Sequence, residues 1–222
     1  MSAARDVLGG HLLMPVIVSD EPAHAPGLAR ALADGGLPLA EVTLREYRAL
    51  EVLQAMAAGS ADVTVGAGTV VSADQVDSAV DAGARFLVSP GLAVDVVERA
   101  QARGVPILPG VATPTDLMSA TALGLDLVKL FPAGPLGGPA VVQALAAPFP
   151  AMAFVPTGGV GPDDVEAYLA VHAVAAVGGS WMVPAAAVAS GDHETVRRLT
   201  ADSVRTARAA RPSPDHDRPD ER

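Results

Sequence analysis

Eight short apolar runs alternate with longer alanine-rich segments along most of this chain of 222 residues. The short runs have the length of buried β-strands, whereas the longer segments have the apolar periodicity of helices. Strands are expected at 13–18, 40–44, 63–67, 85–89, 106–108, 125–130, 153–156 and 173–177. Helices are expected at 22–34, 46–58, 73–82, 93–102, 114–123, 137–147, 162–171 and 193–209. Such alternation predicts the α/β class and a parallel sheet.

Eight strand–helix units are the number that closes a (β/α)8 TIM barrel. The alternative is a doubly wound open sheet, which would carry a glycine-rich turn after its first strand if it bound a dinucleotide. Here that strand is followed by Ser19-Asp20-Glu21-Pro22, which is no phosphate loop. We therefore expect one (β/α)8 barrel domain over residues 1–210. Residues 211–222 are polar and proline-rich, and we expect them to form a disordered tail.

The composition excludes several classes of partner. A net charge of −10 argues against binding to nucleic acid or to an anionic membrane surface, since both need a basic face. No uninterrupted run of about 18 apolar residues occurs, so no transmembrane helix is expected. The chain has no cysteine, which excludes disulfides and cysteine nucleophiles and fits a cytoplasmic location.

Lys129 is the only lysine in the chain, which otherwise carries fourteen arginines. It stands in the apolar run 127–132, at the end of the sixth expected strand. Burial of an ammonium group is costly and favours the neutral amine, which is the form that attacks a carbonyl to make a Schiff base. The alternative is a structural lysine that reaches the surface or pairs with a carboxylate.

Polar residues at other strand ends are expected to lie near Lys129, because the active site of a barrel lies at the carboxyl ends of its strands. Glu41 lies within the second expected strand, and if its side chain points inward, then Thr43 does too. Glu41 fits either a structural ion pair or a proton-transfer group. Arg45, at the strand tip, fits either a clamp for a substrate carboxylate or a solvated arginine.

Two glycine pairs follow the seventh and eighth expected strands. Gly158-Gly159 and Gly178-Gly179-Ser180 occupy the loops that often bind phosphate in this architecture through backbone N–H groups, although tight turns alone would also use glycine. The five histidines show no ligand spacing, and no metal-binding motif is present.

Six motifs in order give the chain a family resemblance. It resembles the 2-keto-3-deoxy-6-phosphogluconate (KDPG) aldolase and 4-hydroxy-2-oxoglutarate (KHG) aldolase family between about Pro15 and Asp192. The motifs are Glu41-Val42-Thr43-Leu44-Arg45, Gly66-Ala67-Gly68-Thr69, Ser89-Pro90-Gly91, Lys129-Leu130-Phe131-Pro132, Pro156-Thr157-Gly158-Gly159 and Gly178-Gly179-Ser180-Trp181. The resemblance implies a homotrimeric (β/α)8 barrel and a class I aldolase that acts on small 2-keto acids and sugar phosphates with no metal or other cofactor.

The same resemblance implies a role for each matching residue. Lys129 would be the Schiff-base lysine and Glu41 the general acid and base. The remaining residues would bind substrate. Arg45 and Thr69 would hold the pyruvyl carboxylate, and Phe131 would pack on the pyruvyl carbons. Thr157 would face the cleaved side, and the distal phosphate would be bound by Gly158, Gly159, Gly179 and Ser180. Pro90 would be a further substrate-binding residue.

The resemblance implies cleavage of KDPG to pyruvate and glyceraldehyde 3-phosphate. Arg45 favours this branch over a related one that acts on the galactonate epimer. Three alternatives stay open: cleavage of KHG to pyruvate and glyoxylate, a non-catalytic barrel that binds sugar phosphates, and an isomerase that uses Glu41 as its sole base. The loop 133–138 departs from the family pattern, where a more polar loop is expected, and leaves substrate preference open.

Overall fold

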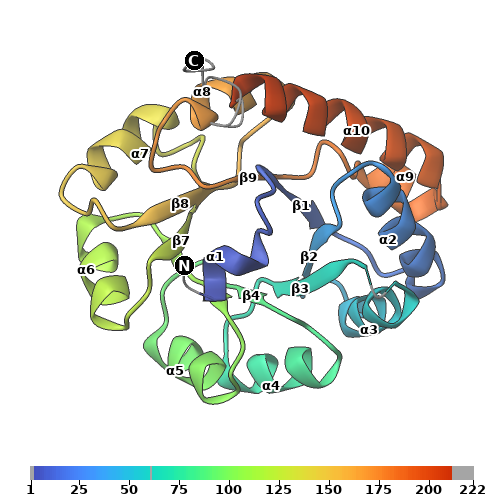
Figure 1. Cartoon of the computed structure of the whole chain (residues 1–222). Coiled ribbons are helices and arrows are strands. Elements are labelled where there is room, and N and C mark those ends of the chain that lie inside the picture. Colours follow the sequence, from blue (N-terminus) through green and yellow to red (C-terminus); the bar gives the residue numbers. More distant parts are fainter. Residues whose placement is uncertain (1–2, 61, 212–222) are drawn as a thin grey trace, which may run out of the picture.

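The computed structural model describes residues 3–60 and 62–211, in which parallel strands curl into a barrel inside a ring of helices (Figure 1). Six strands pair in the order β5-β4-β3-β2-β1-β9 and three in the order β6-β7-β8. The continuous segment 107–111 contributes both β5 and β6, and isolated bridges from Phe154 to Val174 and from Thr157 to Gly178 join β8 to the last strand segment. The circle is thus closed, and the (β/α)8 prediction is confirmed.

The elements follow the expected order along the chain. The strands are β1 (Leu13–Ile17), β2 (Leu39–Thr43), β3 (Thr64–Gly68), β4 (Leu87–Val88), β5 (Ile107–Leu108), β6 (Gly110–Val111), β7 (Leu127–Leu130), β8 (Ala153–Pro156) and β9 (Val177–Gly179). The helices are α1 (Ala3–Val7), α2 (Ala25–Asp34), α3 (Ala49–Gly59), α4 (Ala73–Asp81), α5 (Val94–Ala102), α6 (Pro114–Ala122), α7 (Pro139–Ala146), α8 (Val165–Leu169), α9 (Ala185–Ser190) and α10 (His193–Ala210), with short 3-10 turns at Pro22–His24 and Pro162–Asp164.

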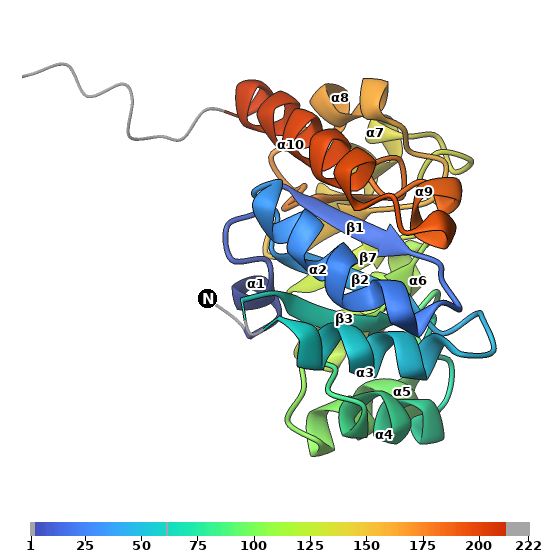
Figure 2. The ribbon, with the colours of Figure 1, turned by 90° about the vertical axis from the view of Figure 1, so that its right-hand side faces the viewer.

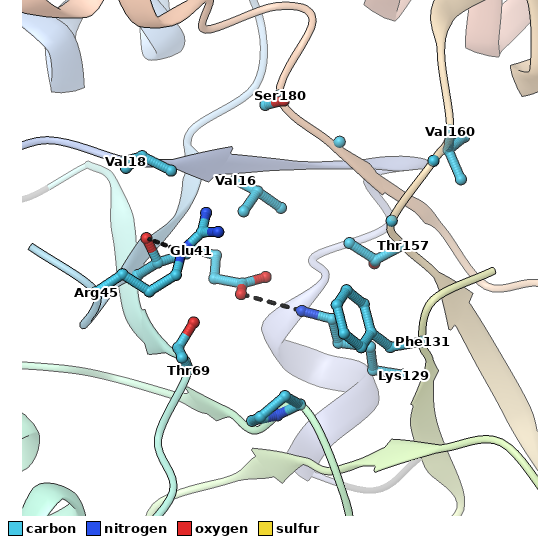
Figure 3. A pocket seen from close by; sticks show the side chains of 15 residues that line it. Val16, Val18, Glu41, Arg45, Thr69, Lys129, Phe131, Thr157, Val160 and Ser180 are labelled. Carbon is cyan, nitrogen blue, oxygen red and sulfur yellow. Dashed lines mark hydrogen bonds and ion pairs between the residues drawn. The ribbon is translucent and has the colours of Figure 1, made fainter. Parts of the chain in front are cut away.

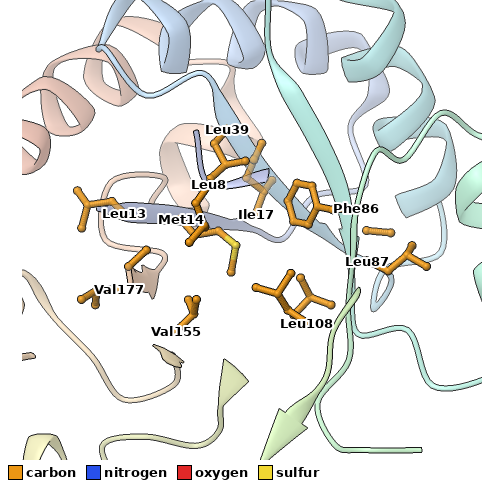
Figure 4. Packing of buried hydrophobic residues seen from close by; sticks show 14 of the residues in the cluster. Leu8, Leu13, Met14, Ile17, Leu39, Phe86, Leu87, Leu108, Val155 and Val177 are labelled. Atoms are coloured by element: carbon orange, nitrogen blue, oxygen red, sulfur yellow. The ribbon is translucent and has the colours of Figure 1, made fainter. Parts of the chain in front are cut away.

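The strands are mostly apolar because both of their faces are covered. Every residue of β2, β7 and β8 is buried, with the barrel interior on one side and helices on the other. Leu13, Met14, Leu108 and Val155 belong to this core (Figure 4). The ring of Phe86 occupies the space beside Gly66 where a side chain would otherwise lie.

The two ends of the barrel differ. Helix α1 lies across the end where the strands begin (Figures 1 and 2). The strands point toward the opposite end, where each one continues into the loop that leads to the next helix. Two of these helices begin at capping residues: Thr113 forms a capping box with Asp116 at the start of α6, and Ser72 caps α4. The carboxyl ends of the strands are therefore left for a site.

Several predicted boundaries were wrong. The eighth strand was expected at 173–177, but β9 begins at Val177, and Val174 forms only an isolated bridge. The fifth strand is interrupted at Pro109, which lacks the N–H needed for the ladder. Helices α1 and α9 were not predicted, because each is only five or six residues long and too short to show a period.

The last helix ends close to its predicted position. Helix α10 ends at Ala210. Arg211, which was assigned to the tail, is anchored instead: its guanidinium donates to the carbonyls of Leu169 at 2.6 Å and Val171 at 3.4 Å. Burial lowers the pKa of Arg211. The rest of the expected disordered tail, 212–222, lies outside the described residues. No helix of the described ranges has both the length and the apolar character needed to cross a bilayer.

Candidate active site

One cavity of about 270 Å³ opens at the carboxyl ends of the strands, and all eleven residues singled out from the sequence line it (Figure 3). They come from six of the eight barrel units, so segments far apart in sequence converge on one rim. The eleven are Glu41, Arg45, Thr69, Pro90, Lys129, Phe131, Thr157, Gly158, Gly159, Gly179 and Ser180.

Lys129 and Glu41 face each other inside this cavity. The Nζ of Lys129 lies 3.3 Å from Oε1 of Glu41, and the two side chains are 7% and 0% exposed. Glu41 is opposite Gly66 in the β2–β3 ladder, and Lys129 is opposite Val155 in the β7–β8 ladder. The ion pair allowed for by the sequence is therefore present, but it lies in the wall of a cavity and not in a closed core.

The second carboxylate oxygen of Glu41 has no hydrogen-bond partner among the described residues, although it is buried. An unpartnered buried polar atom is costly, and a structural ion pair in a sealed core would be expected to satisfy both oxygens. This oxygen keeps an unused capacity to accept a proton or a hydrogen bond.

Phe131 lies beside the amine. Its ring centroid is 5.3 Å from the Nζ of Lys129, within the range of a cation–π contact. The same ring packs against Gly158, where a β-carbon would come within 2.8 Å of Cε2 of Phe131. Phe131 thus lines the site, and it also fixes the position of the first glycine turn.

Arg45 and Thr69 lie on the β2 and β3 side of the cavity. The Nε of Arg45 donates to the hydroxyl of Thr43 at 3.4 Å. Thr69 adopts a left-handed backbone conformation with φ of 59°, which is uncommon for a β-branched residue. Backbone strain of this kind costs on the order of 1–3 kcal/mol and is concentrated at functional sites. The sequence carried no signal for this strain.

The two glycine turns form the far end of the cavity. Gly159 has a φ of 70° and packs against Pro135, while the ring of Trp181 covers Gly179 and donates from Nε1 to the Ser203 hydroxyl at 2.9 Å. Trp181 is therefore a packing residue that anchors the second turn to α10. Of the residues that line the cavity, the cations are Arg45 and Lys129, and neither belongs to these turns.

The unusual loop after β7 packs against the first glycine turn. The backbone N–H groups of Ala133 and Gly134 donate to the carbonyls of Thr157 and Gly158 at 2.8 and 2.9 Å. A β-carbon on Gly134 would meet the carbonyl of Gly159. The glycines of this loop therefore allow two neighbouring loops to approach closely, which explains its apolar composition.

Four further residues line the cavity: Val16, Val18, Thr43 and Val160. Thr43 points inward with Glu41, as period-two alternation predicted. The valines were missed because apolar residues carry no chemical signal in the sequence. The same alternation, applied to Val16 and Val18 in the first expected strand, would have placed them on one face.

No group of three or more histidine, aspartate or glutamate side chains within residues 3–60 and 62–211 is arranged to hold a metal ion. His24 and His193 lie close together, with ring centroids 6.3 Å apart, but as a pair only.

Comparison with known proteins agrees with this geometry. The family model for KDPG and KHG aldolase matches residues 5–199. The 2-dehydro-3-deoxy-phosphogluconate aldolase of Treponema pallidum is 45% identical over 188 residues, which cover 85% of this chain and 90% of that protein.

Two solved structures are similar over nearly the whole chain. The KDPG aldolase of Zymomonas mobilis ZM4, solved with 3-phosphoglycerate, has a TM-score of 0.86 and 40% identity, covering 94% of this chain and 99% of that one. The KDPG aldolase of Legionella pneumophila, with pyruvate captured as a covalent carbinolamine, has a TM-score of 0.87 and 36% identity, covering 91% and 98%. With a lone lysine and a facing carboxylate at the carboxyl end of a (β/α)8 barrel, and with relatives of this identity, the chain belongs to the KDPG and KHG aldolase family.

Proposed function

We propose that this aldolase cleaves KDPG to pyruvate and glyceraldehyde 3-phosphate through a Schiff base on Lys129. The observation that carries the proposal is the buried contact of 3.3 Å between Lys129 and Glu41 in the wall of an open cavity. An amine and a proton-transfer group side by side are what imine chemistry requires. Neither a passive sugar-phosphate-binding barrel nor an isomerase with Glu41 as sole base needs an amine at that point.

The reaction begins when Lys129 passes a proton to Glu41 and its amine attacks the C2 ketone of the substrate. Glu41 then gives that proton to the hydroxyl of the carbinolamine, which leaves as water, and an iminium remains. Glu41 takes the proton from the C4 hydroxyl, the C3–C4 bond breaks, and its electron pair passes into the iminium to give an enamine. Glyceraldehyde 3-phosphate leaves as the aldehyde.

The second half returns the enzyme to its starting state. Glu41 gives a proton to C3 of the enamine, and water hydrolyses the resulting iminium to pyruvate and the ammonium form of Lys129, which pairs again with the Glu41 carboxylate. The unpartnered oxygen of Glu41 supports this role, because it leaves the carboxylate one position for the travelling proton. Phe131, 5.3 Å from the amine, provides an apolar wall for the pyruvyl carbons.

The pyruvyl end is bound by Arg45 and Thr69, with Pro90 closing the same side. A guanidinium binds a carboxylate through two parallel hydrogen bonds, which fixes the orientation of the keto acid. Arg45 supports this role because, among the described residues, no carboxylate forms an ion pair with it. Thr157 lies between the amine and the glycine turns, on the side where the aldehyde product leaves.

The phosphate is bound by the two turns that contain Gly158, Gly159, Gly179 and Ser180. Backbone N–H groups and a hydroxyl are suitable donors for a phosphate. Because these turns contribute no cation to the cavity, the preference for a phosphorylated substrate is measurable but modest, and KHG is cleaved as a side reaction. The dual name of the family is compatible with this pair of substrates.

Borohydride trapping tests the proposal. Reduction in the presence of pyruvate should add one adduct to the intact protein, and peptide mapping should find it on Lys129. Lys129→Ala should lose both the adduct and cleavage, while Glu41→Gln should reduce turnover by about 10²–10⁴-fold. A chelator in the assay should change neither result. An adduct that persists on a side chain of Lys129→Ala would contradict the assignment.

We further propose that residues 1–210 act as one barrel domain in a cytoplasmic homotrimer. Supporting this, several apolar side chains are exposed on consecutive units from the β2–α3 loop to α6, an arrangement typical of an interface. They are Tyr47, Leu50, Val71, Val94 and Met118, which are 100, 39, 56, 48 and 64% exposed. Light scattering after size-exclusion chromatography should give a particle mass three times that of the chain, and Met118→Glu should lower that particle mass. A monomeric wild type would refute the trimer.

A further inference from the structure

The hydroxyl of Thr43 connects the end of β1 to the guanidinium of Arg45. We propose that Thr43 is a positioning residue that holds Arg45 in the orientation that binds the carboxylate of the keto acid. This inference rests on the proposed role of Arg45 and adds a residue that has no part in the mechanism above.

Two hydrogen bonds define the geometry. The Thr43 hydroxyl donates to the carbonyl of Ile17 at 3.0 Å, and it accepts from Nε of Arg45 at 3.4 Å. A hydroxyl has one proton and two acceptor positions. Because the proton is committed to Ile17, the oxygen must present its lone pairs to Arg45. The direction of the contact is therefore fixed by the pairing of β1 with β2, in which Ile17 is opposite Val42.

The contact uses the inner nitrogen of the guanidinium and leaves the outer two free. The tip of Arg45 points toward the cavity in the region of Glu41 and Val16 (Figure 3). Both terminal nitrogens are then available for the two oxygens of a carboxylate. Arg45 is exposed as a residue, whereas Thr43 is only 3% exposed. A rigid, buried group thus tethers a long and otherwise mobile side chain.

The tether matters because ordering such a side chain has an entropic cost. An arginine that must be immobilised when substrate arrives loses affinity, whereas one already held in place does not. Among the described residues, the Thr43 hydroxyl is the only hydrogen-bond or ion-pair partner of the Arg45 side chain. Removal of the hydroxyl should therefore weaken keto-acid binding before it affects the chemical step.

A purely structural role for Thr43 makes a different prediction. Valine has nearly the same shape as threonine, and it also fits a buried strand. If shape alone mattered, Thr43→Val would preserve substrate binding and Thr43→Ser, which leaves a gap, would be worse. If the hydroxyl positions Arg45, the order of the two variants is reversed.

The experiment measures the inhibition constant of pyruvate and kcat for KDPG cleavage in Thr43→Val, Thr43→Ser, Arg45→Ala and the double variant Thr43→Val/Arg45→Ala. Thr43→Val should raise the pyruvate constant by about three- to tenfold with a smaller effect on kcat. In Thr43→Ser, which keeps the hydroxyl, the inhibition constant of pyruvate should lie within about twofold of the wild-type value. In the Arg45→Ala background, Thr43→Val should add less than about twofold, because the two residues act through one contact.

Three outcomes would overturn the inference. Thr43→Ser could bind pyruvate as weakly as Thr43→Val, or Thr43→Val could lower kcat alone and leave the pyruvate constant unchanged. In the third, the losses of pyruvate affinity in Thr43→Val and Arg45→Ala would multiply in the double variant. Arg45→Ala with unchanged pyruvate affinity would instead refute the role of Arg45, and borohydride trapping tests Lys129 separately. Thermal unfolding checks that each variant folds. If Thr43→Val does not fold, Thr43→Ala replaces it, since alanine removes the hydroxyl without placing a methyl group against the Ile17 carbonyl.

Discussion

The carboxylate of Glu41 fills the space beside Gly68 in which a β-carbon would lie. Thr43 is opposite Gly68 in the ladder between β2 and β3, so the missing side chain on β3 leaves a recess next to the inward face of β2. The long side chain of Glu41 turns into this recess and still reaches Lys129. The second glycine of the Gly66-Ala67-Gly68-Thr69 motif is therefore explained by the position of the carboxylate.

Gly68→Ala should displace Glu41 and lower kcat. A methyl group at this position overlaps the carboxylate, and misplacement of a catalytic group by about 1 Å can reduce the rate by about 10²-fold. We expect a loss of that order in kcat, with pyruvate affinity much less affected because Arg45 is untouched. Gly161→Ala is the matched control, since a β-carbon there meets only Asp164 at 3.7 Å. Equal activity of the two variants would show that Glu41 does not depend on this recess.

The buried pair of Lys129 and Glu41 should limit the stability of the fold. Removing one partner leaves an uncompensated buried charge, which costs about 3–5 kcal/mol, whereas replacing both with apolar groups is often neutral or stabilising. We expect Glu41→Gln to lower the free energy of unfolding, and the double variant Glu41→Gln/Lys129→Met to recover most of that loss while remaining inactive. Urea denaturation of the three proteins measures both effects. A double variant less stable than Glu41→Gln would contradict the expectation.

Ser180→Ala should lower kcat/KM for KDPG more than kcat/KM for KHG. The Ser180 hydroxyl lines the end of the cavity that we propose binds the phosphate, and a hydrogen bond to a charged group is worth about 1.5–3 kcal/mol when it is made away from water. Because Ser180 is exposed, we expect the lower end of that range: about a tenfold fall in kcat/KM for KDPG, and less than about twofold for KHG. Ser78→Ala, which removes an exposed hydroxyl on α4, is the control. Equal losses on both substrates would show that the turn does not bind phosphate.

His11 should make stability depend on pH. Burial, together with the nearby Arg208 guanidinium, lowers the pKa of His11 below its ordinary value of 6.5. The unfolded chain then binds the proton more readily than the native state, so stability is complete above pH 6.5 and falls as the pH drops toward the lowered pKa of the folded state. Wild type should lose more stability than His11→Gln between about pH 8 and about pH 5, measured by urea midpoints. An identical decline in the two proteins would rule out this contribution.

The sequence by itself determined the alternation of strands and helices and the rim on which the chemistry lies. In a parallel barrel every strand ends at the same side, so reading the residues at strand ends is enough to collect Lys129, Glu41, Arg45 and the glycine turns. The helix expected at 114–123 and the strand expected at 125–130 rest on local patterns, which is why both are found close to their expected positions.

Only the tertiary structure decided how these residues meet. The contact of Lys129 with Glu41 spans 88 positions of sequence, and its length depends on barrel closure and strand register. The recess at Gly68, the strained backbone of Thr69 and the tether from Thr43 to Arg45 depend on neighbouring strands in the same way. The late start of β9 has the same origin, because a strand pairs where its neighbours present free backbone groups and not where its own residues are most apolar. Local pattern reports the preference of each segment, whereas distances between side chains are set by the packing of all segments together.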